Sequence, residues 1–265
     1  MSLFGAAFFL RQFMKILLTN DDGYQAVGIN ILAKYLREAG HKVYIVAPKH
    51  EQSAGSHAIT VNKPVFTERI KENIWSVDAK PVDCVFIALE KLIDEDIDLV
   101  LSGINSGQNM GEDLLYSGTV AAAAEAMLYG KKAVALSIEN YENQKFETAA
   151  YFTVKLIEDG IVDLIGEKEM LNINFPDVEI DQIKGVKITK TGHREYSNFV
   201  HEQYTPSGKK VFWVGGNSPE TCNSENSDYL AVSERFISIT PVYPDFTKKE
   251  SIKKFKKFIE IKGRQ

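Results

Sequence analysis

The run KILLTNDDG, at residues 15–23, joins a short apolar segment to a polar turn. Residues 15–19 have the unbroken apolar character of a buried parallel strand, and the Asn, Asp and Gly that follow are turn residues. Residues 29–39 carry apolar side chains at helical spacing, and Gly40 suits the C-terminal cap of that helix. Residues 41–47 (HKVYIVA) form the next expected strand. A strand, a helix and a strand in this order predict a βαβ unit, and hence an α/β protein with a parallel sheet.

The rest of the chain continues this alternation and then changes its pattern. Strands are expected at 98–101 and 133–138, helices at 81–93, 119–129 and 148–157, and a hairpin or similar excursion at 59–66 and 73–77. Later strand-like runs lie at 171–175, 185–190, 210–215 and 236–243, and a lysine-rich amphipathic helix follows at 248–261. We expect the part from about 171 to 265 to extend the core, with exposed strands that can pair with another subunit.

The composition is that of an ordinary globular protein. The 265 residues are 44% apolar and 25% charged, and the formal net charge is -5. This balance argues against a broad basic surface for a nucleic-acid polymer, although it permits a pocket for one small phosphate. No stretch approaches the roughly 20 apolar residues of a membrane span, and we expect a cytoplasmic protein. The two cysteines, Cys84 and Cys222, lack zinc-ligand spacing, and the apolar run around Cys84 indicates a buried thiol.

Residues 1–13 (MSLFGAAFFLRQF) are apolar but differ from a secretory signal. They lack a basic beginning, their apolar run is short, and Arg11 interrupts it. The first strand starts almost at once, at Lys15, which leaves no room for a cleavage linker. We therefore interpret residues 1–13 as an extension or tag, with Met14 as the natural start, and residues 14–265 as one domain.

Two adjacent carboxylates, Asp21 and Asp22, follow the first strand. Sites in open α/β sheets form at the carboxyl ends of strands. Neighbouring carboxylates there repel each other, and a cation such as Mg²⁺ or Mn²⁺, which prefers oxygen ligands, relieves the repulsion. Both side chains can bind one ion only where the strand has already bent, which Gly23 permits. The tetrapeptide alone is equally compatible with an ordinary turn that carries solvated acids.

Two further strand ends favour a metal site. The loop after the second strand holds Ser53 and Ser56, and the strand at 98–101 runs into SGIN at 102–105. A hydroxyl and the side-chain amide of Asn105 are neutral oxygen ligands that complete the shell of a hard cation. The sequence has no His/Cys cluster at ligand spacing, which argues against zinc. Taken singly, Ser53 and Asn105 are ordinary loop residues, and the residues alone do not choose Ser53 over Ser56.

A stretch rich in Gly and Asn, with Gly107 and Asn109, precedes an alanine-rich helix that begins near Ser117, Gly118 and Thr119. Ser117 is placed to cap the helix, and the free N–H groups of its first turn form an anion site. Gly118 lets the backbone approach a phosphate closely. No Walker lysine motif is present, which disfavours a P-loop NTPase. The alternative is a capped helix after a loop, with no ligand.

A cation and an anion site at one sheet edge predict phosphomonoester hydrolysis. The metal would bind a phosphoryl oxygen, lower the pKa of a water molecule and neutralise developing charge. Backbone N–H groups and Asn109 would hold the phosphate oxygens while the water attacks phosphorus directly. The expected catalytic residues are Asp21, Asp22 and Asn109.

Several segments together resemble the SurE family, stationary-phase survival proteins that act as metal-dependent 5'/3'-nucleotidases. The matching segments are KILLTNDDG (15–23), VAPKHEQSAGS (46–56), LSGINSGQNMGEDLLYSGTVAAAAEA (101–126), LNINFP (171–176) and ISITPVYPDFT (237–247). The resemblance covers about residues 14–247, and the long stretch at 101–126 is highly specific. It implies a Rossmann-like three-layer α/β core with a C-terminal β-rich extension, through which subunits form a homodimer or homotetramer.

The resemblance also implies the site and its substrate. The family's metal ligands carry over onto Asp21, Asp22, Ser53 and Asn105, with one Mg²⁺ or Mn²⁺ per subunit. The residues on the phosphate side carry over onto Asn20, Gly107, Asn109, Ser117, Gly118 and Thr119. The implied substrates are nucleoside monophosphates, with tolerance for other phosphoesters and short polyphosphate. The sequence departs from the family where Gly-Thr-Pro is usual before an Asp-Cys pair: residues 79–84 read AKPVDC, which leaves details of the substrate loop open.

Two rival functions stay open at this point. A haloacid-dehalogenase-type phosphatase uses an Asp nucleophile with a second Asp two positions on, whereas Asp21 and Asp22 are adjacent. A non-catalytic nucleotide- or metal-binding regulatory protein is the other, and the intact ligand set disfavours it. His57 is a candidate general acid, although a lone loop histidine is more often solvated or structural. His193 and Arg194 are candidates for a substrate or subunit contact and stay outside the catalytic set.

Overall fold

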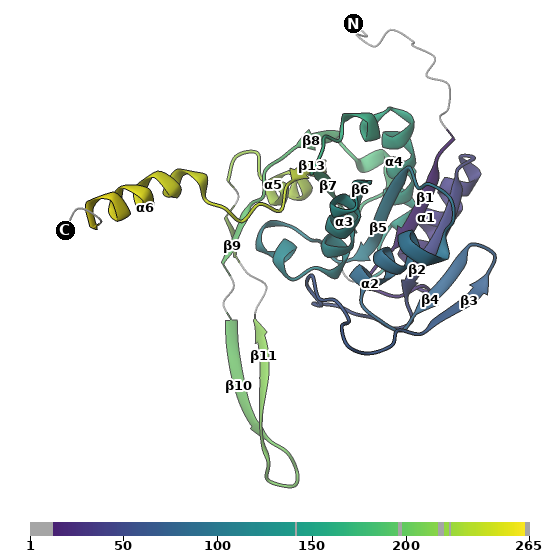
Figure 1. The fold of residues 1–265 in the computed structure, drawn as a ribbon. Helices are drawn as coiled ribbons and strands as arrows, with labels where there is room; N and C mark the ends of the chain where they lie inside the picture. The colour runs from purple at the N-terminus through teal and green to yellow at the C-terminus, as the bar shows by residue number, and fades with distance from the viewer. Residues whose placement is uncertain (1–12, 141, 196–197, 217–219, 223, 263–265) are drawn as a thin grey trace, which may run out of the picture.

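A nine-stranded sheet runs through the middle of the protein (Figure 1). The computed structural model describes residues 13–140, 142–195, 198–216, 220–222 and 224–262. The strands of the sheet are β1 Lys15–Thr19, β2 Lys42–Pro48, β3 Thr67–Lys71, β4 Ile74–Val77, β5 Leu99–Ser106, β6 Lys132–Ile138, β7 Met170–Phe175, β8 Val186–Ile188 and β13 Ile237–Val242. Their order is β3-β4-β2-β1-β5-β6-β7-β13-β8. The central six, from β4 to β7, run parallel, while β3, β13 and β8 run the other way.

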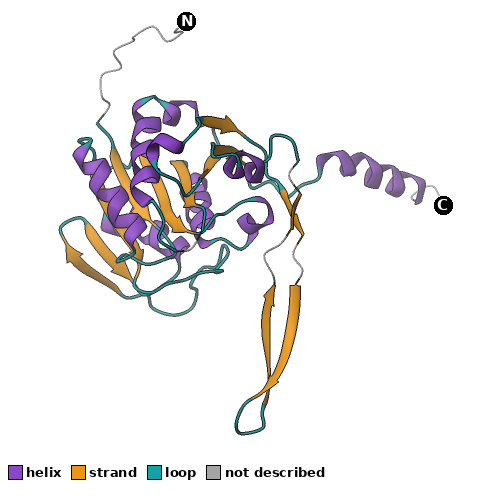
Figure 2. Cartoon of the chain, turned by 180° about the vertical axis from the view of Figure 1, so that it is seen from behind, coloured by secondary structure: helices purple, strands orange, loops and turns teal. Residues whose placement is uncertain are grey.

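Helices cover both faces of the sheet, which makes three layers (Figure 2). On one face α1 (Val27–Glu38) packs against α4 (Phe146–Glu158), and on the other α2 (Pro81–Ile87) packs against α3 (Gly118–Leu128). Each face has its own core of buried side chains. The expected α/β fold with a mostly parallel sheet is therefore confirmed.

β1 shows why the first run is apolar throughout. Ile16 and Leu18 point into the core on the α1 side, whereas Leu17 points into the core on the α3 side. Successive side chains of a strand face opposite ways, so a strand that is covered on both faces shows no polar alternation. β1 therefore lies in the centre of the sheet and holds the turn that follows it firmly in place.

The predicted end of one strand, at Leu101, is wrong, because β5 continues to Ser106. The pairing of β5 with β6 shifts register between Ser102 and Asn105 and then resumes. Gly103 makes the shift possible: its φ is +134°, and a Cβ there would lie 2.2 Å from the carbonyl oxygen of Leu136. The irregular strand carries Asn105 along the sheet edge instead of releasing it into a loop.

Two other boundaries differ from expectation. The hairpin is formed by β3 and β4, and residues 59–66 are not a strand. Thr60 is instead held by Asp83, whose carboxylate accepts hydrogen bonds from the Thr60 N–H (2.8 Å) and hydroxyl (2.6 Å). The helix expected at 81–93 ends as α2 at Ile87 and continues as a π-helical segment, Ala88–Leu92. The other expected elements form with ends within two residues of prediction.

The C-terminal part contributes both to the sheet and to projecting arms. β7, β13 and β8 complete the sheet, while α5 (Asp228–Ser233) packs against β13. A ribbon of β10 (Asn198–Tyr204) and β11 (Lys210–Gly216) projects from the body, and β9 (His193–Glu195) pairs with β12 (Glu220–Cys222) at its base (Figure 1). The expected extension at residues 1–13 lies outside the described residues except for Phe13, whose side chain is exposed.

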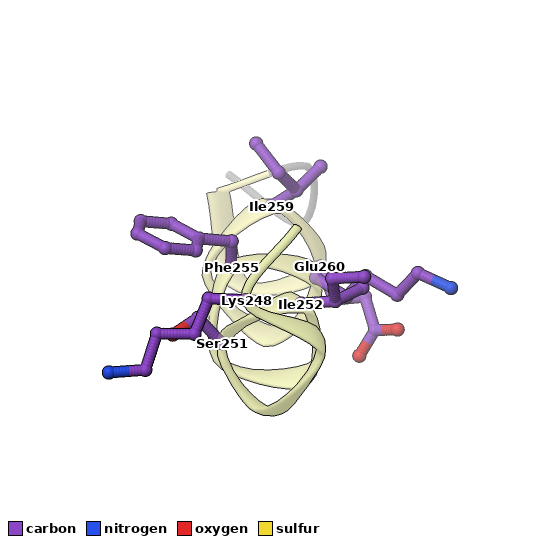
Figure 3. Close-up of a pocket in the computed structure, with 7 residues that line it drawn as sticks. Lys248, Ser251, Ile252, Phe255, Ile259 and Glu260 are labelled. Atoms are coloured by element: carbon purple, nitrogen blue, oxygen red, sulfur yellow. The ribbon is translucent and has the colours of Figure 1, made fainter. Parts of the chain in front are cut away.

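The last helix, α6 (Lys249–Lys262), also stands away from the body (Figures 1 and 2). Side chains radiate from it in several directions, and they include the apolar Ile252, Phe255 and Ile259 and the charged Glu260, with Lys248 directly before the helix (Figure 3). The exposed fractions of the three apolar side chains are 41%, 65% and 66%. The hollow along this helix is lined only by α6 and Lys248, so it is remote from the strand ends of the core. Among the described residues, no helix is both long and apolar enough to cross a membrane.

Candidate metal and phosphate site

The carboxyl ends of β1 and β5 lie side by side at the point where the strand order of the sheet reverses. From β1 the chain crosses to β2 on one side, and β5 then lies against β1 on the other side. Thr19, the last residue of β1, is in register with Ser102 of β5. Such switch points are where open α/β sheets bind their ligands.

Asn20 and Gly23 form the turn that bends the chain at the end of β1. The Asn20 side chain accepts a hydrogen bond from the Gly23 N–H (3.1 Å) and donates one to the Gly23 carbonyl (2.9 Å). Gly23 has a φ of +101°, a conformation that favours glycine. This turn projects Asp21 and Asp22 from the strand end. Asn20, predicted on the phosphate side, is buried and uses these side-chain hydrogen bonds to hold the turn.

Asp21 lies against the beginning of α3. The Thr119 hydroxyl donates a hydrogen bond to its carboxylate. Gly118 is packed so closely that a Cβ there would lie 2.9 Å from both the Cβ and Oδ2 of Asp21. Burial raises the pKa of Asp21, and hydrogen bonds from the Thr119 hydroxyl and from the N–H groups of Thr119 and Gly118 oppose that rise. The positive end of α3 therefore points at the carboxylate.

Asp22 has an unfavourable environment for its charge. Burial, and then the charge of Asp21, raise its pKa to about 6, and Glu51 adds to the rise. One hydrogen bond opposes it, from the N–H of Ser106 to Oδ2 at 3.1 Å. In the part of the chain that the structure describes, no Lys, Arg or His forms a salt bridge with either aspartate. A divalent cation would supply the missing positive charge.

The side-chain oxygen of Asn105 points toward Thr119, the residue that also contacts Asp21. Its amide nitrogen donates to the carbonyl of Gly107 at 2.7 Å, and its Oδ1 lies 3.4 Å from the Thr119 hydroxyl, which also contacts Asp21. Oxygens of Asp21 and Asn105 thus converge on one hydroxyl. No group of three or more His, Cys, Asp or Glu at metal-binding spacing occurs among the described residues. The donor set of two carboxylates and neutral oxygens fits a hard cation such as Mg²⁺ or Mn²⁺.

The loop with Ser53 reaches this edge of the sheet, but its hydroxyl is engaged elsewhere. The N–H of Gln52 donates to the backbone carbonyl of Asp21 at 2.7 Å. The exposed Ser53 donates its hydroxyl to Glu51 Oε1 at 2.6 Å, and no described bond joins it to the aspartates. The hydroxyl of Ser56, the alternative, donates to the carbonyl of Leu115 at 2.7 Å.

Residues 107–117, which we name the anion loop, connect β5 to α3. Ser117 caps α3 as predicted, since its hydroxyl oxygen accepts a hydrogen bond from the N–H of Val120 at 3.1 Å. Gly107 donates its N–H to the carbonyl of Ile138 at 3.1 Å. That N–H therefore fastens the loop to β6, while those of Gly118 and Thr119 donate to the carboxylate of Asp21.

Asn109 is buried and held by three polar residues of β6 and β7. Its amide nitrogen donates to the Ser137 hydroxyl at 2.8 Å, and its backbone N–H donates to Asn174 Oδ1 at 2.9 Å. Its carbonyl accepts from Asn172 (2.8 Å) and from Asn174 (3.0 Å). We did not predict these partners from the sequence. The signal was present: two asparagines at alternate positions of LNINF, inside a strand that is otherwise apolar, indicate buried polar partners.

A pocket of about 390 Å³ opens beside α3. Its lining includes Ser56, His57 and Val120, and its size is that of a small-molecule pocket. His57 Nε2 lies 2.8 Å from Glu125 Oε2. Glu125 is seven residues along α3 from Gly118, a rise of about 10 Å, so His57 contacts the helix well away from Asp21.

The other histidine in question, His193, contacts Glu112 of the anion loop through its Nδ1. Its neighbour Arg194 belongs to β9, but its side chain lies outside the described part of the structure. Neither residue forms a described contact with the two aspartates.

Comparison with known proteins identifies the family of this chain. The family model described as "Survival protein SurE" matches residues 16–198, more than half of the chain. The chain belongs to the SurE family. Two relatives named 5'-nucleotidase SurE are those of Caldanaerobacter subterraneus subsp. tengcongensis, 42% identical over 243 residues (90% of this chain, 95% of the relative), and Methylobacillus flagellatus, 41% identical over 248 residues (94% and 100%).

A solved SurE structure has the same fold. The crystal structure of the SurE protein from Aquifex aeolicus matches with a TM-score of 0.82 and 35% sequence identity. The match covers 92% of this chain and 99% of the other. The resemblance to SurE that the sequence motifs indicated is therefore confirmed.

Proposed function

We propose that this chain is a metal-dependent phosphomonoesterase, a 5'-nucleotidase that hydrolyses nucleoside monophosphates. One observation carries the proposal: Asp21, Asp22 and Asn105 converge at the N-terminus of α3. Cation ligands and the positive end of a helix there share one sheet edge. The two SurE relatives named above carry the same activity in their names.

The metal-binding residues in this proposal are Asp21, Asp22, Asn105 and Ser53. The first three already lie together, and Ser53 would join them by turning its hydroxyl away from Glu51. A divalent cation, Mg²⁺ or Mn²⁺, supplies polarisation of a phosphoryl oxygen and a water molecule of lowered pKa.

The phosphate-binding groups in this proposal are the first turn of α3 and Asn109. The N–H groups of Gly118 and Thr119 donate to Asp21 in this structure, so they would bind a phosphate once that carboxylate turns toward the metal. Gly118 has no side chain, which lets Asp21 pack directly against the start of α3. The Asn109 amide carries two hydrogens, of which one goes to Ser137 and the other is left for a phosphate oxygen. Charge that develops on the phosphoryl group would then meet donors that are already oriented.

The pocket beside α3 would take the nucleoside. The lining includes Val120, two residues along α3 from Gly118, and we propose that the rest of the nucleotide reaches this pocket from a phosphate at the helix end. The volume of about 390 Å³ suits a ligand of that size, and the lining permits other phosphoesters. We further propose a homodimer or homotetramer that forms through the β10–β11 ribbon and α6.

The proposal is tested by phosphate release from AMP by the full-length protein, with Mg²⁺, with Mn²⁺ and with excess EDTA. We expect turnover with either metal and none with EDTA. A protein that binds nucleotide but releases no phosphate would instead be regulatory. A radiolabelled phosphoaspartate, trapped by acid quench, would point to covalent catalysis at Asp21 or Asp22 and contradict direct attack by water.

A further inference from the structure

A buried carboxylate far from the metal ligands in sequence is bonded to the anion loop. Asp228, at the start of α5, is fully buried. Its Oδ2 accepts a hydrogen bond from the N–H of Gly111 at 3.0 Å, and its Oδ1 accepts from the N–H groups of Gly192 (2.8 Å) and Tyr229 (2.9 Å). One side chain therefore ties the anion loop, the segment that leads into β9, and α5 together.

Tyr229 adds a second attachment at the same place. Its hydroxyl donates to the carbonyl of Met110 at 2.7 Å, and Met110, Tyr229 and Val232 form a small apolar cluster. The ring of Tyr229 packs against two glycines, since a Cβ on Gly111 would come within 2.9 Å of it and one on Gly192 within 2.6 Å. The backbone of Met110 and Gly111 is therefore fixed by both hydrogen bonding and packing.

The attachment lies between the two phosphate-binding parts of the loop. Asn109 precedes Met110 and is held by β6 and β7, while Ser117 follows and caps α3. Fixing Gly111 therefore fixes the spacing between Asn109 and the first turn of α3. No described hydrogen bond connects α5 to the proposed metal ligands.

Asp228 suits this task because an ionised carboxylate only accepts hydrogen bonds. Three backbone N–H groups converge on it, and an amide in its place would set a donor against a donor. A buried carboxylate is costly unless it is well bonded, and here the N–H groups of Gly111, Gly192 and Tyr229 compensate it. Local packing alone does not require a charged group at this position.

We propose that Asp228 and Tyr229 are positioning residues for phosphate recognition. They hold Met110 and Gly111 so that Asn109 and the N-terminus of α3 face the same phosphate. This inference rests on the proposed function. It means that phosphate binding depends on α5, whereas cation binding does not.

The test compares Asp228→Asn, Tyr229→Phe and a control, Ser233→Ala, in the full-length protein. Ser233 is on the same helix but exposed, and its hydroxyl donates to the carbonyl of Leu230, its one hydrogen bond among the described residues. For each variant we would measure Mn²⁺ affinity by calorimetry, the inhibition constant of inorganic phosphate, and KM and kcat for AMP. Circular dichroism would identify variants that fail to fold.

We expect Asp228→Asn to weaken phosphate binding about tenfold and Tyr229→Phe about threefold, which is roughly 1.4 and 0.6 kcal/mol. KM should rise in parallel, while Mn²⁺ affinity stays within about twofold, as expected for sites that share no contacts. Ser233→Ala should match wild type. If Asp228→Asn does not fold, Tyr229→Phe, which loses a single hydroxyl, carries the test.

Two failures can be told apart. Folded variants that bind phosphate as tightly as an active wild type would overturn the positioning role alone. So would a loss of Mn²⁺ affinity in step with phosphate affinity, because the attachment would then support the whole site. A wild type without metal-dependent turnover would overturn the proposed function itself.

Discussion

At the scale of single residues, a cation would favour the ionised forms of Asp21 and Asp22, whereas the metal-free protein disfavours them. Burial disfavours the ionised form of both, and the charge of Asp21 adds to the effect on Asp22. The N–H of Ser106 and the hydroxyl of Thr119 compensate only in part. The residues that are best placed to bind a cation are therefore the ones that destabilise the metal-free fold at neutral pH.

The metal-free protein should lose stability as the pH rises through the titration of Asp22. Its pKa is raised from 3.8 to about 6, so the folded state binds more protons than the unfolded chain between these values. The contribution of Asp22 to the free energy of unfolding is thus greatest below pH 3.8. It is lost as the pH rises through about 6. Urea unfolding in EDTA at pH 5 and pH 7 should show a decrease on the order of 1 kcal/mol that Asp22→Asn removes. An identical pH dependence in the variant would contradict this account.

Asp22→Asn should also separate folding from activity. The variant keeps the shape of the side chain and removes a desolvated charge, so it should fold at least as well as wild type in EDTA. Its kcat/KM for AMP with Mn²⁺ should fall about a hundredfold or more, with a matching loss of Mn²⁺ affinity. Wild-type values for both quantities would show that Asp22 does not bind the metal.

At the scale of elements, the site depends on how closely α3 approaches the end of β1. Gly118→Ala would place a Cβ 2.9 Å from Asp21, so either the helix or the aspartate must move. We expect a loss of activity of at least about tenfold and a destabilisation of about 1–3 kcal/mol. The matched control is Gly130→Ala at the other end of α3, where φ is +72° and nothing lies within 4 Å. It should lose stability by about 1 kcal/mol through backbone strain and keep its activity.

Kinetics with AMP and thermal melting of both glycine variants would check this prediction. Equal losses of activity in the two would mean that helix stability matters, rather than the contact between Gly118 and Asp21. The comparison is informative because the two positions lie at opposite ends of one helix and differ in what surrounds them.

The same elements show what could be predicted from the sequence. β1 and the cap at Ser117 were predictable, because an unbroken apolar run and a serine before an alanine-rich helix are local signals. The continuation of β5 past Gly103 was not, since it depends on the carbonyl of Leu136 on the next strand. The partners of Asn109 and the bond from Asp228 to Gly111, 117 residues away, were missed for the same reason.

At the scale of the whole molecule, two arms leave the body with apolar side chains exposed. In the ribbon these include Val200, Phe212 and Val214, which share one face, and in α6 they include Phe255 and Ile259. Exposed apolar surface of this kind is unusual in a monomer. In the proposed homodimer or homotetramer, a second copy of the chain would cover these apolar side chains.

Charge placed on α6 should therefore weaken the assembly. Phe255→Glu with Ile259→Glu should shift the mass measured by light scattering from a multimer toward one chain. Lys253→Ala, which leaves the apolar side chains of α6 intact, should not. A wild type that is monomeric at micromolar concentration would contradict the proposed assembly and leave the site within one chain unaffected.

The central claim is that one cation sits where β1 and β5 end, and crystals soaked in Mn²⁺ would test it most directly. The account predicts an anomalous-difference peak about 2 Å from oxygens of Asp21, Asp22 and Asn105, and its loss in Asp22→Asn crystals. A peak elsewhere in the molecule, with none between these three side chains, would contradict the account.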